Sequence, residues 1–139
     1  MFLDASAVVA ILKREADADH LLARLDAMQS QPLFSPLSRF EAIVSLARAD
    51  SGQHRASTPE RIEAAEAAVD RLLTDIRAKN MDLTEQIGLE ALEATKSYGR
   101  AVGHPAALNL GDCFAYACAK AAGVGLLYKG EDFGKTDLA

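Results

Sequence analysis

Very short apolar segments alternate along this chain with longer segments of helical periodicity, and this alternation limits the choice of fold. Residues 1–5 are expected to form a short buried strand, and residues 32–36, 81–83 and 124–130 are expected to form further short strands, because these segments are apolar and are bounded by turn or helix-start residues. A helical segment follows each of the first three, and strands that are joined through helices pair in parallel. We therefore expect an α/β sandwich in which helices surround a mostly parallel, short-stranded central sheet.

The helical segments carry start signals. Six helices are expected, over residues 6–15, 16–30, 37–50, 58–80, 85–102 and 112–123. Ser6, Thr58 and Thr84 are the expected N-caps, and Pro59 is the expected first residue of its helix. Apolar stripes are expected at Leu21, Leu22 and Leu25 in the second helix and at Ile62, Val69, Leu72, Leu73 and Ile76 in the fourth. Residues 50–57 are interpreted as a connection between helices and residues 103–111 as a loop.

Composition indicates one globular domain. A chain of 139 residues is long enough for one hydrophobic core, so we expect a single domain over residues 1–139. Half of the residues are hydrophobic and 25% are charged, as in most globular proteins. No apolar run reaches the roughly 18 residues of a membrane span and no signal segment follows Met1, so a cytoplasmic location is expected. Cys113 and Cys118 are expected to be buried thiols, because their spacing places them on different faces of one helix.

Several acidic residues lie where a strand ends or a helix begins. Asp4 ends an apolar strand, where a carboxylate needs partners or a raised pKa, so it is either a helix cap or a ligand. Glu41 has two interpretations, because it is a functional acid or completes a capping box with Ser38, with Leu37 as the hydrophobic staple. Asp112 is favoured by the dipole of its helix, which also keeps a carboxylate ionised for a metal ion.

Three further acids follow the last expected strand. Glu131, Asp132 and Asp137 fit a polar turn, but ligands of α/β sheets bind at the carboxyl ends of the strands. Carboxylates that converge there repel one another unless a cation lies between them. Oxygen ligands without a His or Cys pair select a hard ion, Mg²⁺ or Mn²⁺, and such an ion suits the hydrolysis of phosphate esters.

The net charge of −5 does not exclude a nucleic-acid substrate. The acids that are set aside as metal ligands for this argument are Asp4, Glu41, Asp112, Asp132 and Asp137. Without them, 15 acids remain against 15 Lys and Arg residues, so the rest of the protein is nearly neutral. Candidate phosphate contacts are Arg39, Arg48, Lys96, Arg100, Lys120, Lys129 and Lys135. Binding of RNA is therefore compatible with the sequence but is not demonstrated by it.

Four segments together resemble the PIN-domain ribonucleases of the VapC toxin type. They are "FLDASAVVAIL", "SRFEAIVSL", "GHPAALNLGDCFAYACAK" and "LLYKGEDFGKTDL", and they extend in the family's order from one end of the chain to the other. The resemblance implies a PIN-like α/β/α sandwich and a Mg²⁺- or Mn²⁺-dependent endoribonuclease toxin. It also implies RNA as the substrate, such as tRNA or a ribosomal RNA loop, a cognate VapB-type antitoxin that neutralises the toxin, and a homodimer.

The resemblance also implies which residues form the site. By position, the catalytic and metal-binding acids of the family correspond to Asp4, Glu41, Asp112 and Asp132. Ser6 corresponds to a hydroxyl that supports the water shell of the metal, although a plain N-cap explains it equally well. Glu131 stands where similar toxins have Asn or Asp, so the fourth acid stays open among Glu131, Asp132 and Asp137, and Asp132 is our prediction. His104 is interpreted as a hydrogen-bonding loop residue or an RNA contact.

Other classes of function share part of this pattern. A receiver-type phosphoacceptor domain has acids after its first strand and a lysine after a late strand, a position that Lys129 could fill. Such a domain also needs a mid-chain Asp at a strand end to accept the phosphoryl group, and this sequence lacks one. A dehalogenase-like phosphatase needs a second Asp where Ser6 stands. A non-catalytic PIN-like module that only binds partners does not need four acids, so the presence of all four argues against this alternative.

Overall fold

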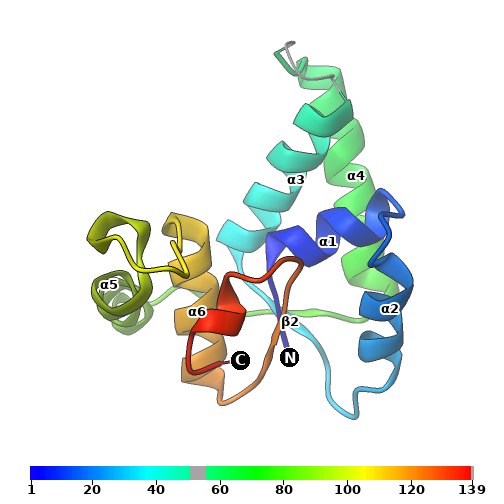
Figure 1. Cartoon of the computed structure of the whole chain (residues 1–139). Helices are drawn as coiled ribbons and strands as arrows, with labels where there is room; N and C mark the ends of the chain where they lie inside the picture. The colour runs from blue at the N-terminus through cyan, green and yellow to red at the C-terminus, as the bar shows by residue number, and fades with distance from the viewer. Residues whose placement is uncertain (51–55, 139) are drawn as a thin grey trace.

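Four two-residue strands form a parallel sheet at the centre of the computed structural model, which describes residues 1–50 and 56–138 (Figure 1). The strands are β1 (Phe2–Leu3), β2 (Leu33–Phe34), β3 (Lys79–Asn80) and β4 (Leu126–Leu127), in the spatial order β3-β2-β1-β4. Phe2 of β1 is in register with Leu33 on one side and with Leu126 on the other. Because every pair is parallel, the carboxyl ends of the strands meet at one edge of the sheet.

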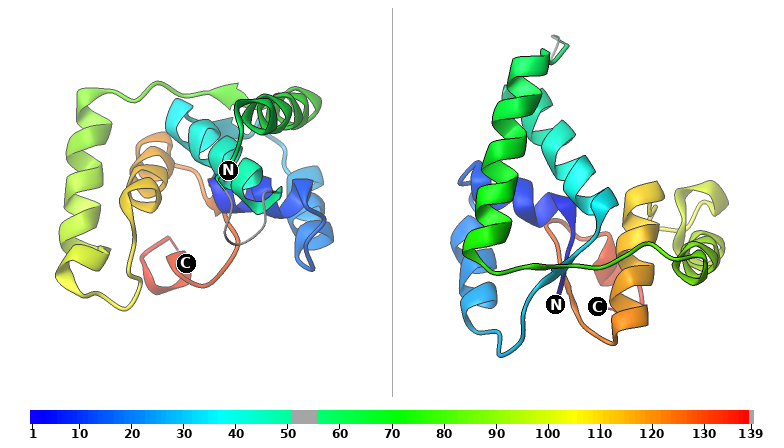
Figure 2. Two further views of the ribbon diagram at one scale, coloured as in Figure 1. Left: turned by 90° about the horizontal axis from the view of Figure 1, so that it is seen from above. Right: turned by 180° about the vertical axis from the view of Figure 1, so that it is seen from behind.

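Helices cover both faces of the sheet (Figures 1 and 2). On one face lie α1 (Ala5–Leu12), α2 (Ala18–Asp26), α3 (Pro36–Asp50) and α4 (Pro59–Asp75). On the other face lie α5 (Glu85–Tyr98) and α6 (Leu110–Ala122), with the short 3-10 helices η1 (Arg100–Val102) and η2 (Phe133–Lys135). Figure 2 shows α3 and α4 side by side as a pair that extends away from the sheet. The expected α/β/α sandwich is confirmed.

Each face of the sheet carries its own apolar core, because side chains alternate along a strand. Leu3 and Leu127 pack against the core of α1 to α4, whereas Phe2 and Leu126 pack against the core of α5 and α6. All four side chains are at most 3% exposed. Strands of only two residues thus anchor both cores, and the backbone that follows β1 and β4 is held in place.

The helix starts agree with the sequence-based expectation at two of three caps. Thr58 and Thr84 cap α4 and α5, and Pro59 is the first residue of α4. The prediction of Ser6 as an N-cap is wrong, because α1 begins one residue earlier and Asp4 caps it. Asp4 directly follows the strand, so its carboxylate lies at the first turn of α1 and accepts the N–H of Ser6 there. Ser6 itself already lies within the helix.

Two further expectations differ from the structure, and a third falls mostly outside the described residues. The strand expected at residues 81–83 lies at Lys79–Asn80 instead, where it pairs with β2. The stripes of α2 and α4 are partly solvent-exposed, since Leu22 is 36% and Ile62 is 39% exposed. The connection expected over residues 50–57 falls mostly on residues 51–55, outside the described ranges. Among the helices in those ranges, none has both the length and the apolar character that crossing a bilayer requires.

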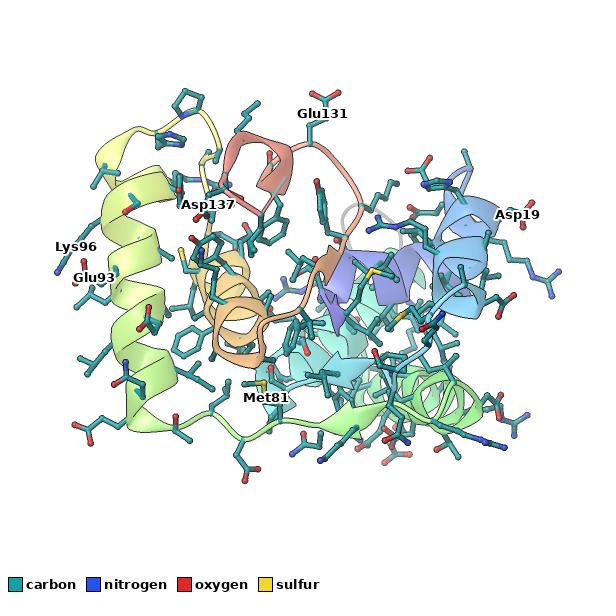
Figure 3. The ribbon with its side chains drawn as sticks, turned by 90° about the horizontal axis from the view of Figure 1, so that it is seen from below. Asp19, Met81, Glu93, Lys96, Glu131 and Asp137 are labelled. Carbon is teal, nitrogen blue, oxygen red and sulfur yellow. The ribbon has the colours of Figure 1, made fainter. Side chains whose placement is uncertain are left out.

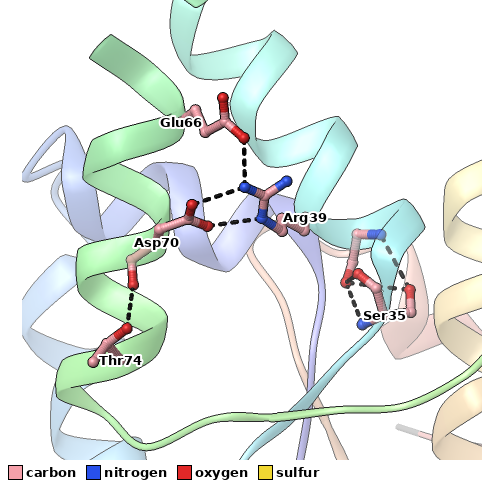
Figure 4. A network of polar contacts seen from close by, with 6 residues as sticks. Ser35, Arg39, Glu66, Asp70 and Thr74 are labelled. Atoms are coloured by element: carbon pink, nitrogen blue, oxygen red, sulfur yellow. Dashed lines mark hydrogen bonds and ion pairs between the residues drawn. The ribbon is translucent and has the colours of Figure 1, made fainter. Parts of the chain in front are cut away.

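A polar network joins α3 to α4 (Figure 4). The Nε and Nη2 atoms of Arg39 donate to the two carboxylate oxygens of Asp70 at 2.7 and 2.8 Å, and Nη2 also donates to Glu66 at 2.7 Å. These bonds raise the pKa of Arg39 and lower the pKa of Asp70. Arg39, a candidate phosphate contact in the sequence, is therefore engaged in holding two helices together.

Candidate active site

A pocket of about 290 Å³ opens at the carboxyl edge of the sheet. Its wall combines the end of β1, the start of α1, the middle of α3, the start of α6 and the segment after β4. The lining residues are Asp4, Ala5, Ser6, Val9, Glu15, Glu41, Ser45, Asn109, Asp112 and Lys129. Three of the four acids that the sequence singled out thus share one pocket, at the edge where parallel strand ends meet.

Asp4 is the most deeply buried acid of the pocket, with only 5% of the residue exposed. Its Oδ2 atom accepts the N–H of Ser6 at 2.9 Å and also the Ser6 hydroxyl. Its own N–H donates to the carbonyl of Leu127 at 2.9 Å, which ties the end of β1 to β4. Burial raises the pKa of Asp4, while the bonds from Ser6 and Ala5 oppose that rise. Asp4 is both a helix cap and a pocket acid, so the two interpretations of the sequence coexist.

Glu41 is not part of a capping box, and that interpretation of the sequence is wrong. The reciprocal bonds at the start of α3 join Ser35 and Ser38, whose N–H groups donate to each other's hydroxyl oxygens at 2.9 and 3.1 Å. Glu41 lies beyond this first turn and lines the pocket. Burial, together with the charges of Asp4 and Asp112, raises the pKa of Glu41 to about 7.

Asp112 closes a capping box at the start of α6. Its N–H donates to the Asn109 side chain at 3.1 Å, and its Oδ2 atom accepts the N–H of Asn109 at 2.8 Å. Burial raises the pKa of Asp112, as do the charges of Asp4 and Asp132, whereas the Asn109 bond and the charge of Arg100 lower it. The helix-start role and the pocket role of Asp112 therefore coexist, as its position in the sequence indicates.

The three acids after β4 have different surroundings. Asp132 is exposed and directly precedes η2, where its charge raises the pKa of the acid at the start of α6. Glu131 points away from the molecule (Figure 3). Asp137 accepts hydrogen bonds from the side chains of Tyr116 at 2.5 Å and Lys120 at 2.7 Å. Asp132 therefore does not line the pocket, although its charge acts on Asp112, and Asp137 is engaged with Tyr116 and Lys120 of α6.

Ser6 connects the pocket to the segment after β4. Its hydroxyl donates to Asp4 and accepts the backbone N–H of Lys129 at 3.0 Å. The ammonium group of Lys129 forms an ion pair with Glu15, and the hydrogen bond between them lowers the pKa of Glu15 and raises that of Lys129. Lys129 therefore places a cation at the margin of an otherwise acidic pocket.

Two smaller expectations are confirmed. His104 is a hydrogen-bonding loop residue, because its Nδ1 atom accepts the N–H of Ala106 at 3.1 Å and its ring packs edge-on against Tyr98. Cys113 and Cys118 are both buried free thiols.

Sequence reasoning missed the start of α6, which lies two residues before the expected helix start at position 112. Asn109 is its cap and Gly111 lies in its first turn, against the Glu41 carboxyl group. The signal was present, because Asn109 and Asp112 have the three-residue spacing of a capping box. Glu15, the partner of Lys129, gave no comparable signal in the sequence.

The donor chemistry of the pocket fits a hard divalent cation. In the part of the chain that the structure describes, no group of three or more Asp, Glu, His or Cys side chains stands in an arrangement that holds a metal ion. The pocket nevertheless presents the carboxylates of Asp4, Glu41 and Asp112, whose pKa values are all raised. A cation offsets the repulsion between such acids and the cost of keeping their charges away from water. Oxygen ligands favour Mg²⁺ or Mn²⁺ as that cation.

Comparison with known proteins points to one family. The PIN domain family matches the chain over residues 1–138. A VapC ribonuclease of Rhizobium meliloti is 42% identical over 139 residues, which cover 99% of this chain and 98% of that protein. Ribonuclease VapC42 of Mycobacterium tuberculosis is 36% identical over 138 residues, which cover 99% and 96%.

A solved structure has the same fold. The crystal structure of VapC20 of Mycobacterium tuberculosis, a Sarcin-Ricin loop cleaving toxin, aligns with a TM-score of 0.66 and 19% identity. The alignment covers 96% of this chain and 92% of VapC20. The full-length sequence matches and this shared fold exclude the receiver-type and dehalogenase-like alternatives, and the chain belongs to the VapC ribonucleases of the PIN domain family.

Proposed function

We propose that this protein is an endoribonuclease toxin that depends on Mg²⁺ or Mn²⁺ and acts as a single PIN domain in the cytoplasm. The ligands and catalytic residues are Asp4, Glu41, Asp112 and Asp132. The observation that carries the proposal is the convergence of three buried or half-buried acids, with raised pKa values, in one pocket at the sheet edge. The relatives named as ribonucleases match along their whole length, which supports the same activity here.

Hydrolysis of an RNA phosphodiester needs an oriented water and compensation for the charge that develops on the phosphate. A divalent ion held by Asp4, Glu41, Asp112 and Asp132 would supply both, because it would lower the pKa of a bound water and attract the phosphate oxygens. Asp4 and Asp112 accept backbone N–H bonds that hold their carboxylates in fixed orientations. The Ser6 hydroxyl restrains Asp4 from the side of the segment after β4. These bonds preorganise the site before the substrate arrives.

The RNA is proposed to meet the pocket at Lys129. This side chain lines the pocket and is exposed, so it can leave Glu15 and contact a phosphate of the substrate. The exchange costs little, because exposed ion pairs such as that between Lys129 and Glu15 are weak. A single-stranded loop of a structured RNA, such as tRNA or ribosomal RNA, is the expected target because its backbone can enter an open pocket.

Control of the activity is proposed to come from a VapB-type antitoxin, and the toxin is proposed to form a homodimer. An Arg or Lys side chain from the antitoxin that enters the acidic pocket competes with the metal ion for the same carboxylates. The negative charges of Asp4, Glu41 and Asp112 act on one another in this pocket, so together they attract a cation that enters, metal or guanidinium.

The proposal is tested with purified protein on total RNA in the presence of Mg²⁺, Mn²⁺ or EDTA. We expect discrete cleavage with either metal, no cleavage in EDTA and none with Asp4→Asn. Asp19→Asn serves as the matched control, since it removes one carboxylate from the first turn of α2, an exposed position outside the pocket. Cleavage that ignores both EDTA and Asp4→Asn contradicts the proposal. Binding of RNA without cleavage identifies a non-catalytic PIN-like module.

The fourth acid is tested by comparing Asp132→Asn with Asp137→Asn. Asp137 is already held by Tyr116 and Lys120, so its replacement should leave both cleavage and Mn²⁺ affinity unchanged. Asp132→Asn should weaken Mn²⁺ binding and lower the cleavage rate at least about tenfold. The opposite pattern assigns Asp137 as the fourth acid.

A further inference from the structure

Gly111 stands at the closest approach of α3 and α6. A Cβ atom built on Gly111 lies 2.0 and 2.1 Å from the two carboxylate oxygens of Glu41 and 2.4 Å from its carboxyl carbon. These are the three nearest atoms, and all belong to one functional group of the pocket. The carboxyl group of Glu41 therefore occupies the volume that any other residue at position 111 fills with its side chain.

Backbone conformation gives no reason for a glycine at this position. Gly111 lies in the first turn of α6, between Leu110 and Asp112, and its φ is not among the positive values that favour glycine. Glycine in a helix is less favourable than alanine by roughly 0.5 to 1 kcal/mol. A residue that weakens its own helix without a conformational need indicates that the missing side chain is what matters.

We infer that Gly111 is a positioning residue whose absent side chain lets Glu41 place its carboxylate beside Asp112 at the metal site. The inference rests on the proposed function and adds a residue that touches neither ion nor RNA. Glu41 belongs to α3 and Asp112 to α6, so their carboxylates share the pocket only if the first turn of α6 has no bulk on this face. With alanine at position 111, the flexible Glu41 side chain moves away and the site loses one ligand.

The test is a double-mutant cycle on the full chain with Gly111→Ala, Glu41→Ala and their combination. Mn²⁺ affinity is measured by calorimetry and stability by urea unfolding in EDTA. Gly111→Ala should weaken Mn²⁺ binding by about 10- to 100-fold, as loss of a positioning residue typically does, and by about as much as Glu41→Ala. In the Glu41→Ala background, Gly111→Ala should have no further effect on Mn²⁺ affinity, because it acts only through Glu41.

Gly88→Ala in α5 is the matched control, because Gly88 is a helical glycine whose added Cβ meets no atom within 4 Å. Gly88→Ala should raise the urea midpoint and leave Mn²⁺ affinity unchanged. Gly111→Ala combined with Glu41→Ala should likewise raise the midpoint above that of Glu41→Ala alone. A lower midpoint in that background shows that Gly111 serves only the packing of α3 against α6, and it overturns the inference.

The inference and the proposed function fail in different ways. If Gly111→Ala binds Mn²⁺ as tightly as the unmodified protein, the positioning role is wrong while the metal site stands. If the unmodified protein binds no Mn²⁺, the proposed function is wrong. In that case the unfolding free energies of Gly111→Ala, Glu41→Ala and their combination still show whether the two positions are coupled, because urea unfolding in EDTA needs no metal.

Discussion

Two pocket acids combine a structural and a chemical role in the same side chain. Asp4 caps α1, and Asp112 closes a capping box with Asn109, so backbone N–H groups hold each carboxylate in the metal-free protein. Burial raises the pKa of both acids, and the capping bonds oppose that rise. Burial of these carboxylates therefore lowers the free energy of unfolding of the metal-free protein. In return, the carboxylates need little rearrangement when a cation binds.

The two roles of Asp4 can be separated by two substitutions. Asp4→Asn removes a buried charge but keeps a side chain that caps helices about as well as Asp. Asp4→Ala removes both the charge and the acceptor for Ser6. By urea unfolding in EDTA, we expect Asp4→Asn to be at least as stable as the unmodified protein, and Asp4→Ala to be about 1 kcal/mol less stable than Asp4→Asn. Equal stability of the two variants contradicts a stabilising cap.

Glu41 should make the metal-free protein less stable as the pH rises. Its pKa is about 7 in the folded protein against 4.5 for an ordinary Glu, so between these values the folded state binds more protons than the unfolded state. The stabilisation from protonated Glu41 is complete below about pH 4.5 and is lost as the pH rises through about 7.

Glu41→Gln checks this sign, because a Gln cannot ionise. We expect equal unfolding free energies for the variant and the unmodified protein near pH 4. Near pH 8 the variant should be more stable by about 2 kcal/mol, after allowance for solvent screening of a partly exposed group. The measurement is urea unfolding in EDTA across this range, and a difference that does not change with pH is the contradicting result.

The helices show which parts of this fold a sequence can predict. Thr58 and Pro59 mark the start of α4 in the sequence because the cap and the first helical residue are adjacent in the chain. The start of α3 was ambiguous, since Ser35-x-x-Ser38 and Ser38-x-x-Glu41 have the same spacing, and the correct register depends on where β2 ends. Caps are therefore predictable when one local pattern is present, and overlapping patterns need tertiary contacts to decide between them.

The ion pairs of Arg39 should stabilise the pairing of α3 with α4. Arg39 forms a two-pronged contact with Asp70, which a lysine cannot reproduce. We expect Arg39→Lys to lower the unfolding free energy by about 0.5 to 1 kcal/mol in low salt, and by less in high salt, because screening weakens exposed pairs.

Lys96→Met provides the matched control for Arg39→Lys. Lys96 pairs with Glu93 on the same helix (Figure 3), and both side chains are more than half exposed. Its replacement should change stability by at most about 0.5 kcal/mol. Equal losses from both substitutions, measured by urea unfolding, show that the contact between helices contributes no more than an ordinary surface pair.

At the scale of the whole molecule, the parallel sheet explains why strand ends and helix starts in the sequence indicate the position of the pocket. Asp4 and Asp132 follow β1 and β4, which are neighbours in a parallel sheet, and Asp112 precedes β4 by a single helix. Strand and helix periodicity thus placed Asp4 and Asp112 at junctions of elements, whereas only the family resemblance singled out Asp132 among the acids after β4. The contact between Glu41 and Gly111 was not predictable, because it depends on the distance between α3 and α6 across the sheet edge, which no local pattern in the sequence encodes.

Binding of an ion to this convergence of acids should stabilise the entire fold, and the effect should depend on pH. Mn²⁺ at about 100 times its dissociation constant adds about 2.7 kcal/mol to the unfolding free energy when it binds only the folded state. Because the ion must displace the proton of Glu41 below a pH of about 7, each further unit of acidity should remove up to about 1.4 kcal/mol of that gain.

The measurement is thermal or urea unfolding with and without Mn²⁺ between about pH 6 and 8. Asp4→Asn should show no gain at any pH, because it lacks a buried ligand, whereas Asp19→Asn should behave as the unmodified protein does. A gain that is the same at both ends of the pH range means that the ion binds carboxylates that are already ionised, away from Glu41. If Mn²⁺ still raises the unfolding free energy of Asp4→Asn, the ion binds to acids outside the pocket.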